Sequence, residues 1–94
     1  MNNYSVILGI TYYNNGYFNP GVDASHNLGN HNDALRIILR DQGEINTVIN
    51  REINANGSVR FYGGNDWINF IQDNFQLNEE IHFEVINPNT IRIL

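Results

Sequence analysis

Arg51 and Arg60 flank a short polar stretch that also contains Asn54 and Asn56. The planar guanidinium of arginine can donate two parallel hydrogen bonds to one partner, such as the O6 and N7 atoms of guanine. Asparagine can pair in a similar way with N6 and N7 of adenine, and a carboxylate such as that of Glu52 can accept from N4 of cytosine. These residue types therefore have the chemistry needed to recognise the edges of nucleobases.

The charge balance of the chain limits which nucleic-acid binders are compatible with it. Five arginines stand against ten carboxylates, lysine is absent, and the net charge is −5. This argues against a sequence-independent binder, which depends on neutralising phosphates. The charge is uneven, however: residues 1–22 carry no charged side chain, and residues 45–62 carry only Arg51, Glu52 and Arg60, a net of +1. Two surfaces can therefore escape the overall negative sign.

Catalytic and metal-binding chemistry lacks its usual residues. Common nuclease sites combine carboxylates with lysine, which this chain does not contain. His26, His31 and Asp33 match no standard spacing of metal ligands, and no nucleophile is suggested near them. Gly63-Gly64 lacks the rest of a phosphate-binding loop. We therefore expect no catalytic constellation, no metal and no cofactor in this domain.

Length and composition predict one domain, residues 1–94, with a single modest core. The absence of cysteine excludes disulfides and thiolate metal sites and favours a cytoplasmic setting. No apolar run reaches the ~18 residues that suggest a membrane span, and the first residues, MNNYS, do not resemble a signal peptide. The strand-like ending IRIL leads us to expect the N-terminal domain of a longer protein.

Alternating apolar residues and turn signals predict seven strands. Their expected ranges are 4–13, 17–19, 34–40, 44–53, 58–62, 81–86 and 90–94. The strands at 44–53 and 58–62 would form a hairpin with Arg51 and Arg60 near its tip.

One helix is predicted after Gly63-Gly64, with Asn65 as its N-cap. Trp67, Phe70, Ile71 and Phe75 recur at helical spacing and would form its buried face. A second short helix is expected near residues 22–28. A mostly β chain of this size with one or two short helices suggests a small open barrel.

Residues 65–85, NDWINFIQDNFQLNEEIHFEV, resemble the helix and following strand of B3-like DNA-binding domains. The matching positions are Trp67, Phe70, Leu77, Glu80 and Phe83. Upstream, residues 16–20 (GYFNP) and the hairpin from Asn50-Arg51 to Arg60 are similar to the N-terminal effector domain of EcoRII-type restriction endonucleases. The resemblance covers nearly the whole chain.

The resemblance implies a seven-stranded open pseudobarrel of the B3-like type that binds double-stranded DNA. Two arms, here residues 11–17 and 50–60, would enter the major groove of a short site similar to CCWGG. The domain would act as a monomer and as the recognition or effector module of a type II restriction endonuclease, whose nuclease domain lies elsewhere in the parent chain. The implied DNA-binding residues are Tyr12, Asn14, Asn15, Tyr17, Arg51, Glu52, Asn54, Asn56, Ser58 and Arg60.

Other interpretations of the same residues stay open at this point. Arg51 could form a surface ion pair with Glu52 or Glu44. The tyrosines at positions 12, 13 and 17 could pack the barrel, or they could stack on sugars in a small carbohydrate-binding module. A protein-interaction domain that uses its acidic surface is a third alternative.

Overall fold

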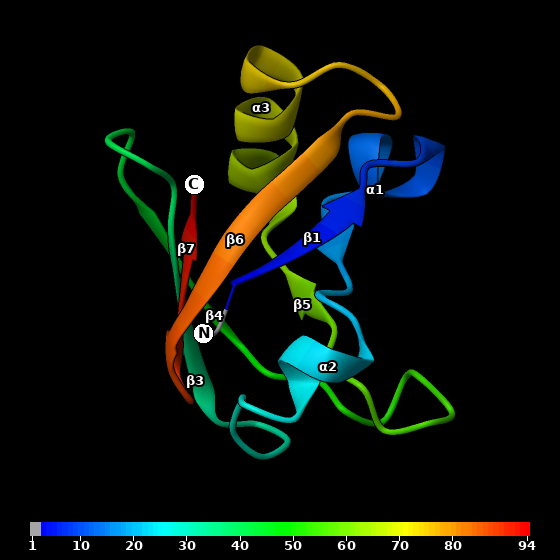
Figure 1. Ribbon diagram of the computed structural model, residues 1–94, viewed down its shortest axis with the longest axis vertical. Coiled ribbons are helices and arrows are strands. Elements are labelled where there is room, and N and C mark those ends of the chain that lie inside the picture. Colours follow the sequence, from blue (N-terminus) through cyan, green and yellow to red (C-terminus); the bar gives the residue numbers. More distant parts are fainter. Residues whose placement is uncertain (1–2) are drawn as a thin grey trace.

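A five-stranded sheet forms one side of the molecule in the computed structural model, which describes residues 3–94. The expected domain, 1–94, also includes Met1 and Asn2, which lie outside the described residues. The strand order is β1 (Asn3–Ile7), β6 (Glu80–Asn87), β7 (Thr90–Ile93), β3 (Ala34–Ile38) and β4 (Glu44–Val48) (Figure 1). All neighbours are antiparallel except β3 and β7, which run parallel.

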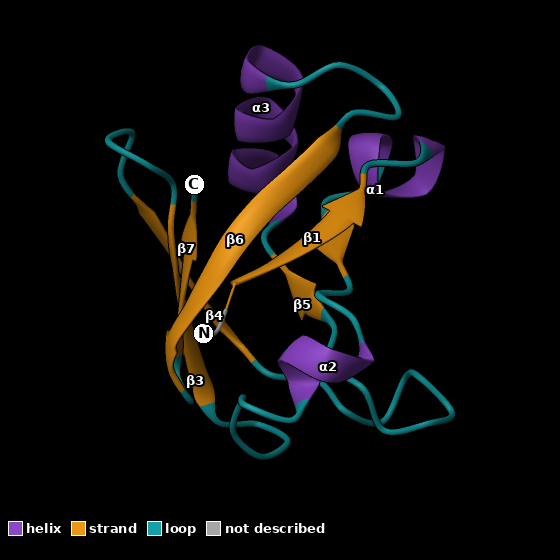
Figure 2. Cartoon of the chain, viewed as in Figure 1, coloured by secondary structure: helices purple, strands orange, loops and turns teal. Residues whose placement is uncertain are grey.

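A separate two-stranded ribbon pairs β2 (Tyr17–Phe18) with β5 (Phe61–Tyr62). Three helices accompany the strands: α1 (Ile10–Asn14), α2 (Val22–Ser25) and α3 (Gly64–Asn74). In the view of Figure 2, α1 lies above this ribbon and α2 below it. The seven expected strands are confirmed within a β-rich α/β fold, but the two sheets do not close on each other, and one more helix is present than the sequence predicted.

The core forms where α3 covers the sheet and the ribbon. Trp67, Phe70, Ile71 and Phe75 are all buried, as their helical spacing predicted. The Trp67 ring lies with its centroid 5.3 Å from that of Phe18. Aromatic pairs at this separation contribute beyond their buried area. The β2–β5 ribbon contains only two residue pairs, so the packing of Phe18 against Trp67 holds it in place.

The first predicted strand was too long at its C-terminal end. The strand ends at Ile7, and residues 10–14 form α1 with Gly9 as N-cap. The alternating pattern that predicted a strand continues through this segment, but tertiary contacts override it. Tyr13 donates its hydroxyl to the carbonyl of Phe75 at 3.1 Å, which ties α1 to the end of α3.

Asn65 does not cap α3 as the sequence predicted. Gly63 is the N-cap, and no side chain bonds to the first turn. The carbonyl of Gly16 instead accepts from the backbone N–H groups of Gly63 and Gly64, at 2.8 and 3.1 Å. Gly16 has φ +76°, and an added Cβ would lie 3.1 Å from the carbonyl oxygen of Gly64. Glycine therefore allows the loop after α1 to dock on the start of α3.

The predicted hairpin of residues 44–62 is reduced to a single antiparallel bridge between Asn50 and Arg60. β4 pairs with β3, and β5 pairs with β2. The Asn50 side chain accepts from the backbone N–H groups of Glu52 and Ile53, which turns the chain away from a strand. Residues 51–59 therefore form an ordered loop, and they do not continue the ladder.

Candidate functional site

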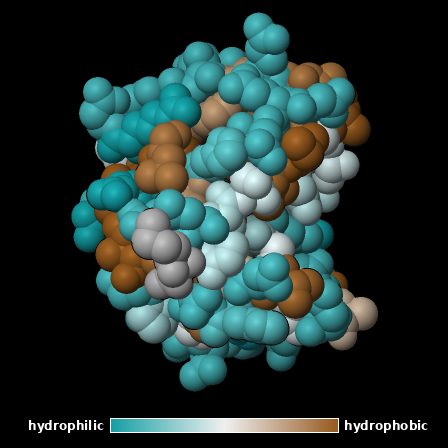
Figure 3. All heavy atoms as spheres, viewed as in Figure 1, coloured by the Kyte–Doolittle hydropathy of each residue, from teal (hydrophilic) through white to brown (hydrophobic). Residues whose placement is uncertain are grey.

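A groove of about 580 Å³ opens between the end of β1, α1 and the β2–β5 ribbon. Three of the predicted site residues line it, namely Tyr12, Tyr17 and Arg60. The remaining lining residues are Ile7, Gly9, Ile10 and Thr11. Figure 3 shows apolar atoms in brown at the upper right, where β1 and α1 lie, and Ile7 and Ile10 are 53% and 61% exposed. The groove thus combines an apolar wall with one cation.

Arg60 is held on two sides within this groove. Its guanidinium carbon lies 4.1 Å from the centroid of the Tyr17 ring, and its Nε donates to Oδ1 of Asn19 at 2.9 Å. Among residues 3–94, no carboxylate pairs with Arg60. The stacked guanidinium therefore keeps its two terminal amino groups for an external acceptor, in the planar geometry that suits a bidentate partner.

Tyr12 forms the inner side of the same groove. Its ring centroid lies 5.3 Å from that of the buried Phe18 and 6.1 Å from that of Tyr17, edge to face in the second case. Burial raises the pKa of the Tyr12 hydroxyl above its usual value of 10.0, opposed by the Arg60 guanidinium and the Asn19 side chain. Tyr12 therefore links the aromatic core to the polar side of the groove.

A second hollow, of about 430 Å³, lies at the tip of the 51–59 loop. Its lining residues are Asn19, Ile53, Asn54, Ala55, Asn56 and Ser58. Asn19 contacts both regions, because it lines this hollow and accepts from Arg60. In Figure 1 the loop extends to the lower right and α1 lies at the upper right, with β5 between them. The two projecting segments thus lie on the same side of the fold.

The asparagines of the tip already serve the backbone of their own loop. Asn56 Oδ1 accepts from the N–H of Ser58 at 3.0 Å, and Asn54 Nδ2 donates to the carbonyl of Ser58 at 3.2 Å. The Asn56 amide N–H groups and the Asn54 carbonyl oxygen carry no hydrogen bond to the described part of the chain. One polar atom of each side-chain amide therefore orders the loop. The other atom, Oδ1 of Asn54 and Nδ2 of Asn56, can form a hydrogen bond with a ligand.

Arg51 is engaged inside the molecule, although the sequence suggested a role like that of Arg60. Its guanidinium donates to four backbone carbonyls at 2.6–3.1 Å. The acceptors are Ser25, Leu28, Gly29 and Gly57. Only one of its five N–H groups is left for another partner. Arg51 therefore joins the loop after α2 to the 51–59 loop, and neither of the ion pairs considered for it, with Glu52 or Glu44, is formed.

The other predicted site residues lie around the edges of this face. Glu52 is exposed and pairs with His31, whose Nε2 lies 3.2 Å from Oε1 of Glu52. Asn14 lies at the end of α1, where its Oδ1 accepts from Gln72 of α3 at 3.3 Å. Asn15 follows α1 and is exposed. These three residues do not line either hollow.

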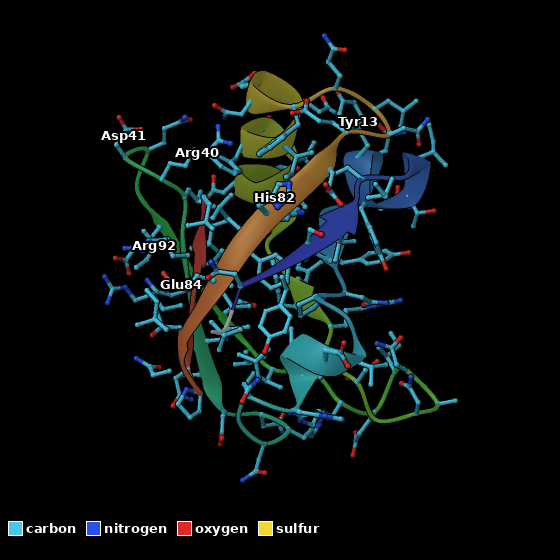
Figure 4. The ribbon with its side chains drawn as sticks, in the orientation of Figure 1. Tyr13, Arg40, Asp41, His82, Glu84 and Arg92 are labelled. Carbon is cyan, nitrogen blue, oxygen red and sulfur yellow. The ribbon has the colours of Figure 1, made fainter. Side chains whose placement is uncertain are left out.

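Arginines elsewhere contact carboxylates or a backbone carbonyl. Arg36 pairs with Glu44 at 3.0 Å and Arg92 with Glu84 at 2.6 Å. Figure 4 shows Arg92 and Glu84 next to each other on the left of the view, away from α1 on the right. Arg40 donates to the carbonyl of Leu94. The cation in the groove thus differs from Arg36 and Arg92, which pair with carboxylates. Arg40 also stacks on an aromatic ring, 4.7 Å from the centroid of Phe75, but it lies outside the groove.

Sequence reasoning missed Asn19, Ile7 and Ile10. For Asn19 the signal was present: Phe18 points inward, so period-two alternation puts Asn19 on the same outward side as Tyr17. Ile7 and Ile10 could not be found in this way, because their exposure follows from the end of β1 and the start of α1, which the sequence did not reveal.

Within the part of the chain that the structure describes, no group of three or more His, Asp or Glu side chains is arranged to hold a metal ion. No helix formed by residues 3–94 has the length and apolar character required to cross a membrane. No protein-family model matches the chain, and comparison with curated proteins and with solved structures finds no match.

Proposed function

We propose that this chain is a sequence-specific double-stranded DNA-binding domain with a B3-like pseudobarrel fold. It binds as a monomer in the major groove of a short site similar to CCWGG, through arms formed by residues 11–17 and 50–60. It serves as the recognition or effector module of a type II restriction endonuclease whose nuclease domain lies elsewhere in the parent chain. The resemblance of residues 16–20, 50–60 and 65–85 supports the family assignment.

The observation that carries the proposal is the state of Arg60. A stacked guanidinium with two unoccupied amino groups matches O6 and N7 of guanine, the commonest base-specific contact of arginine. The partly free amides of Asn54 and Asn56 supply donor and acceptor groups suited to an adenine edge. Exposed Ile10 offers an apolar contact for the methyl group of thymine. One face of the molecule thus carries the groups needed to distinguish base pairs.

Arg51 has a supporting role in this proposal. Its four bonds to carbonyls leave almost no capacity for a base contact, and they fix the loop that carries Asn54 and Asn56. We therefore assign base recognition to Arg60 and the ordering of the arm to Arg51.

The charge distribution predicts how salt acts on this binding. Arg60 is the one arginine of the groove, and Arg51 is engaged with the chain. Each neutralised phosphate contributes about −0.9 to the slope of log K against log salt. We expect a shallow slope of about −1 to −2, because so few cations can face the backbone of DNA.

Carbohydrate binding through Tyr12, Tyr13 or Tyr17 fits the geometry less well. A sugar platform needs an open aromatic face, but the guanidinium of Arg60 covers one face of Tyr17. Tyr13 is packed against the core, and its hydroxyl bonds to Phe75. Tyr12 is half-buried. Salt separates the two functions experimentally, since sugar binding responds little to salt and DNA binding weakens.

The direct test is selection from a randomised duplex library at about 50 mM and about 150 mM salt. The wild-type chain should enrich one short motif that contains G·C pairs. Arg60→Ala should lose this enrichment. Arg36→Ala, which removes an arginine paired with Glu44 on the large sheet, is the matched control and should keep it. No retained duplex at the lower salt concentration, or equal enrichment by Arg60→Ala, would overturn the proposal, and a glycan array would then follow.

A further inference from the structure

We infer that Asn19 determines base preference by fixing the plane of Arg60. This inference rests on the proposed DNA-binding function and adds a residue that is not among the site residues predicted from the sequence. Asn19 does not need to touch DNA, because it acts through the arginine. It is therefore a positioning residue for guanine recognition.

The backbone brings Asn19 and Arg60 together. β2 and β5 pair with Tyr17 opposite Tyr62 and Phe18 opposite Phe61. Extending this antiparallel register by one residue puts Asn19 opposite Arg60, which agrees with the hydrogen bond between their side chains. Residues opposite each other in such a pair have side chains on the same face, and Tyr17 is the diagonal neighbour of Arg60. The register of β2 and β5 thus accounts both for the stacking of Arg60 on Tyr17 and for its hydrogen bond to Asn19.

The ribbon that holds this arrangement is rigid. Phe18 and Phe61 are 1% exposed, and both contact Trp67, with centroid distances of 5.3 and 5.0 Å. The backbone N–H of Arg60 donates to Asn50, and the N–H of Asn50 donates back to Arg60, at 2.8 and 2.9 Å. Both the backbone N–H and the carbonyl of Arg60 are therefore bonded to Asn50, and only the side chain of Arg60 needs to be oriented.

Asn19 restricts the side chain to one productive edge. A guanidinium can offer either its Nε edge or the edge formed by its two terminal amino groups. The bond from Nε to Asn19 Oδ1 occupies the first edge, and stacking on Tyr17 fixes the plane of the second. An arginine without these contacts would rotate and bind phosphates of any sequence. The hydrogen bond from Arg60 to Asn19 therefore increases discrimination between base pairs and does not increase the affinity for DNA of any sequence.

The orientation of the Asn19 amide is itself determined. Its oxygen accepts from Nε of Arg60 at 2.9 Å, so its amino group is not used in this bond. Burial raises the pKa of the Tyr12 hydroxyl and Asn19 lowers it, so the Asn19 side chain lies near that hydroxyl. Asn19 and Arg60 thus form a hydrogen-bonded pair near the Tyr12 hydroxyl.

The test compares Asn19→Ala with Arg60→Ala on the motif selected by the wild-type chain. The measured quantity is the ratio of dissociation constants for the selected duplex and for duplexes with one G·C pair replaced by A·T. Asn19→Ala should reduce this ratio about tenfold while binding to random duplex and the salt slope stay unchanged. Asn69→Ala, an exposed asparagine on α3, is the matched control and should leave the ratio unchanged.

A conservative variant separates positioning from general structure. Asn19→Asp keeps an acceptor for Nε of Arg60, so the ratio should be retained. In the free protein, the NMR signal of the Arg60 Nε–H should exchange slowly with water in the wild-type chain and faster in Asn19→Ala. This measurement needs no DNA.

The outcomes distinguish this inference from the function on which it rests. If the wild-type chain binds no duplex, the proposed function fails, and the inference fails with it. If the wild-type chain binds selectively and Asn19→Ala keeps the full ratio, or if exchange of the Arg60 Nε–H is unchanged, only the inference fails. An equal loss on all duplexes would also contradict it, because that result indicates a contact with phosphate or a damaged fold.

Discussion

Arg51 and Arg60 border the same loop, but their guanidinium groups face different partners. Arg51 donates to four backbone carbonyls of its own chain, whereas Arg60 donates only its Nε, to Asn19, and stacks on Tyr17. Replacing the two arginines should therefore have opposite consequences for stability and for binding.

Arg51→Ala should lower the free energy of unfolding by about 2–4 kcal/mol, because four carbonyls lose a charged donor at once. Urea unfolding measures this difference. Arg51→Lys should also destabilise the chain, since an ammonium cannot reproduce the planar fork. A loss below about 0.5 kcal/mol would contradict the structural role, because surface substitutions fall in that range.

Arg60→Ala should change the free energy of unfolding by less than about 1 kcal/mol, since it removes one hydrogen bond and one stacking contact at the surface. Binding to the selected duplex should weaken by about 1–3 kcal/mol and lose preference at one base pair. Anisotropy titrations on the selected and substituted duplexes check this. The same loss on every sequence would show that Arg60 contacts phosphate.

Gly16→Ala should destabilise the chain more than Gly57→Ala. The two glycines have nearly the same backbone angle, with φ +76° and +75°, so both substitutions carry a similar conformational cost. An added Cβ at Gly16 lies 3.1 Å from the carbonyl oxygen of Gly64, whereas the one at Gly57 meets nothing within 4 Å. The difference in unfolding free energy measures the docking of the loop on α3, and equal effects would argue against that contact.

Stability should fall as pH rises above about 10, and Tyr12 should contribute to the fall. Because burial raises the pKa of Tyr12 in the folded chain, the unfolded chain loses this proton first. Between the two pKa values the folded state binds more protons, so its stability decreases with pH. Thermal unfolding between pH of about 8 and 11 should show a smaller decrease for Tyr12→Phe. An identical decrease in both proteins would contradict burial of the hydroxyl.

Periodicity predicted the elements with long or strongly buried faces. The helical spacing of Trp67, Phe70 and Ile71 identified α3, and the alternation in β3 and β6 identified these strands. One face of each of these elements is buried in the core. The buried positions must be apolar, so the spacing of apolar residues in the sequence shows the type of element.

Elements fixed by distant contacts were not predicted. α1 depends on the bond between Tyr13 and Phe75, and the cap of α3 depends on Gly16, which lies far away in the sequence. The same applies to the site. Arg51 and Arg60 look equivalent along the chain, and only the packing of the loop after α2 against residues 51–59 separates them.

The most direct test of the account is an NMR titration of the wild-type chain with a short G·C-containing duplex at low salt. The account predicts that the Arg60 Nε–H and the amides of residues 10–19 and 53–60 shift with increasing DNA, while those of α3 near Asp66 and Asp73, on an acidic hollow, do not. Shifts confined to other surfaces, or no shifts at all at low salt, would contradict DNA binding by this face.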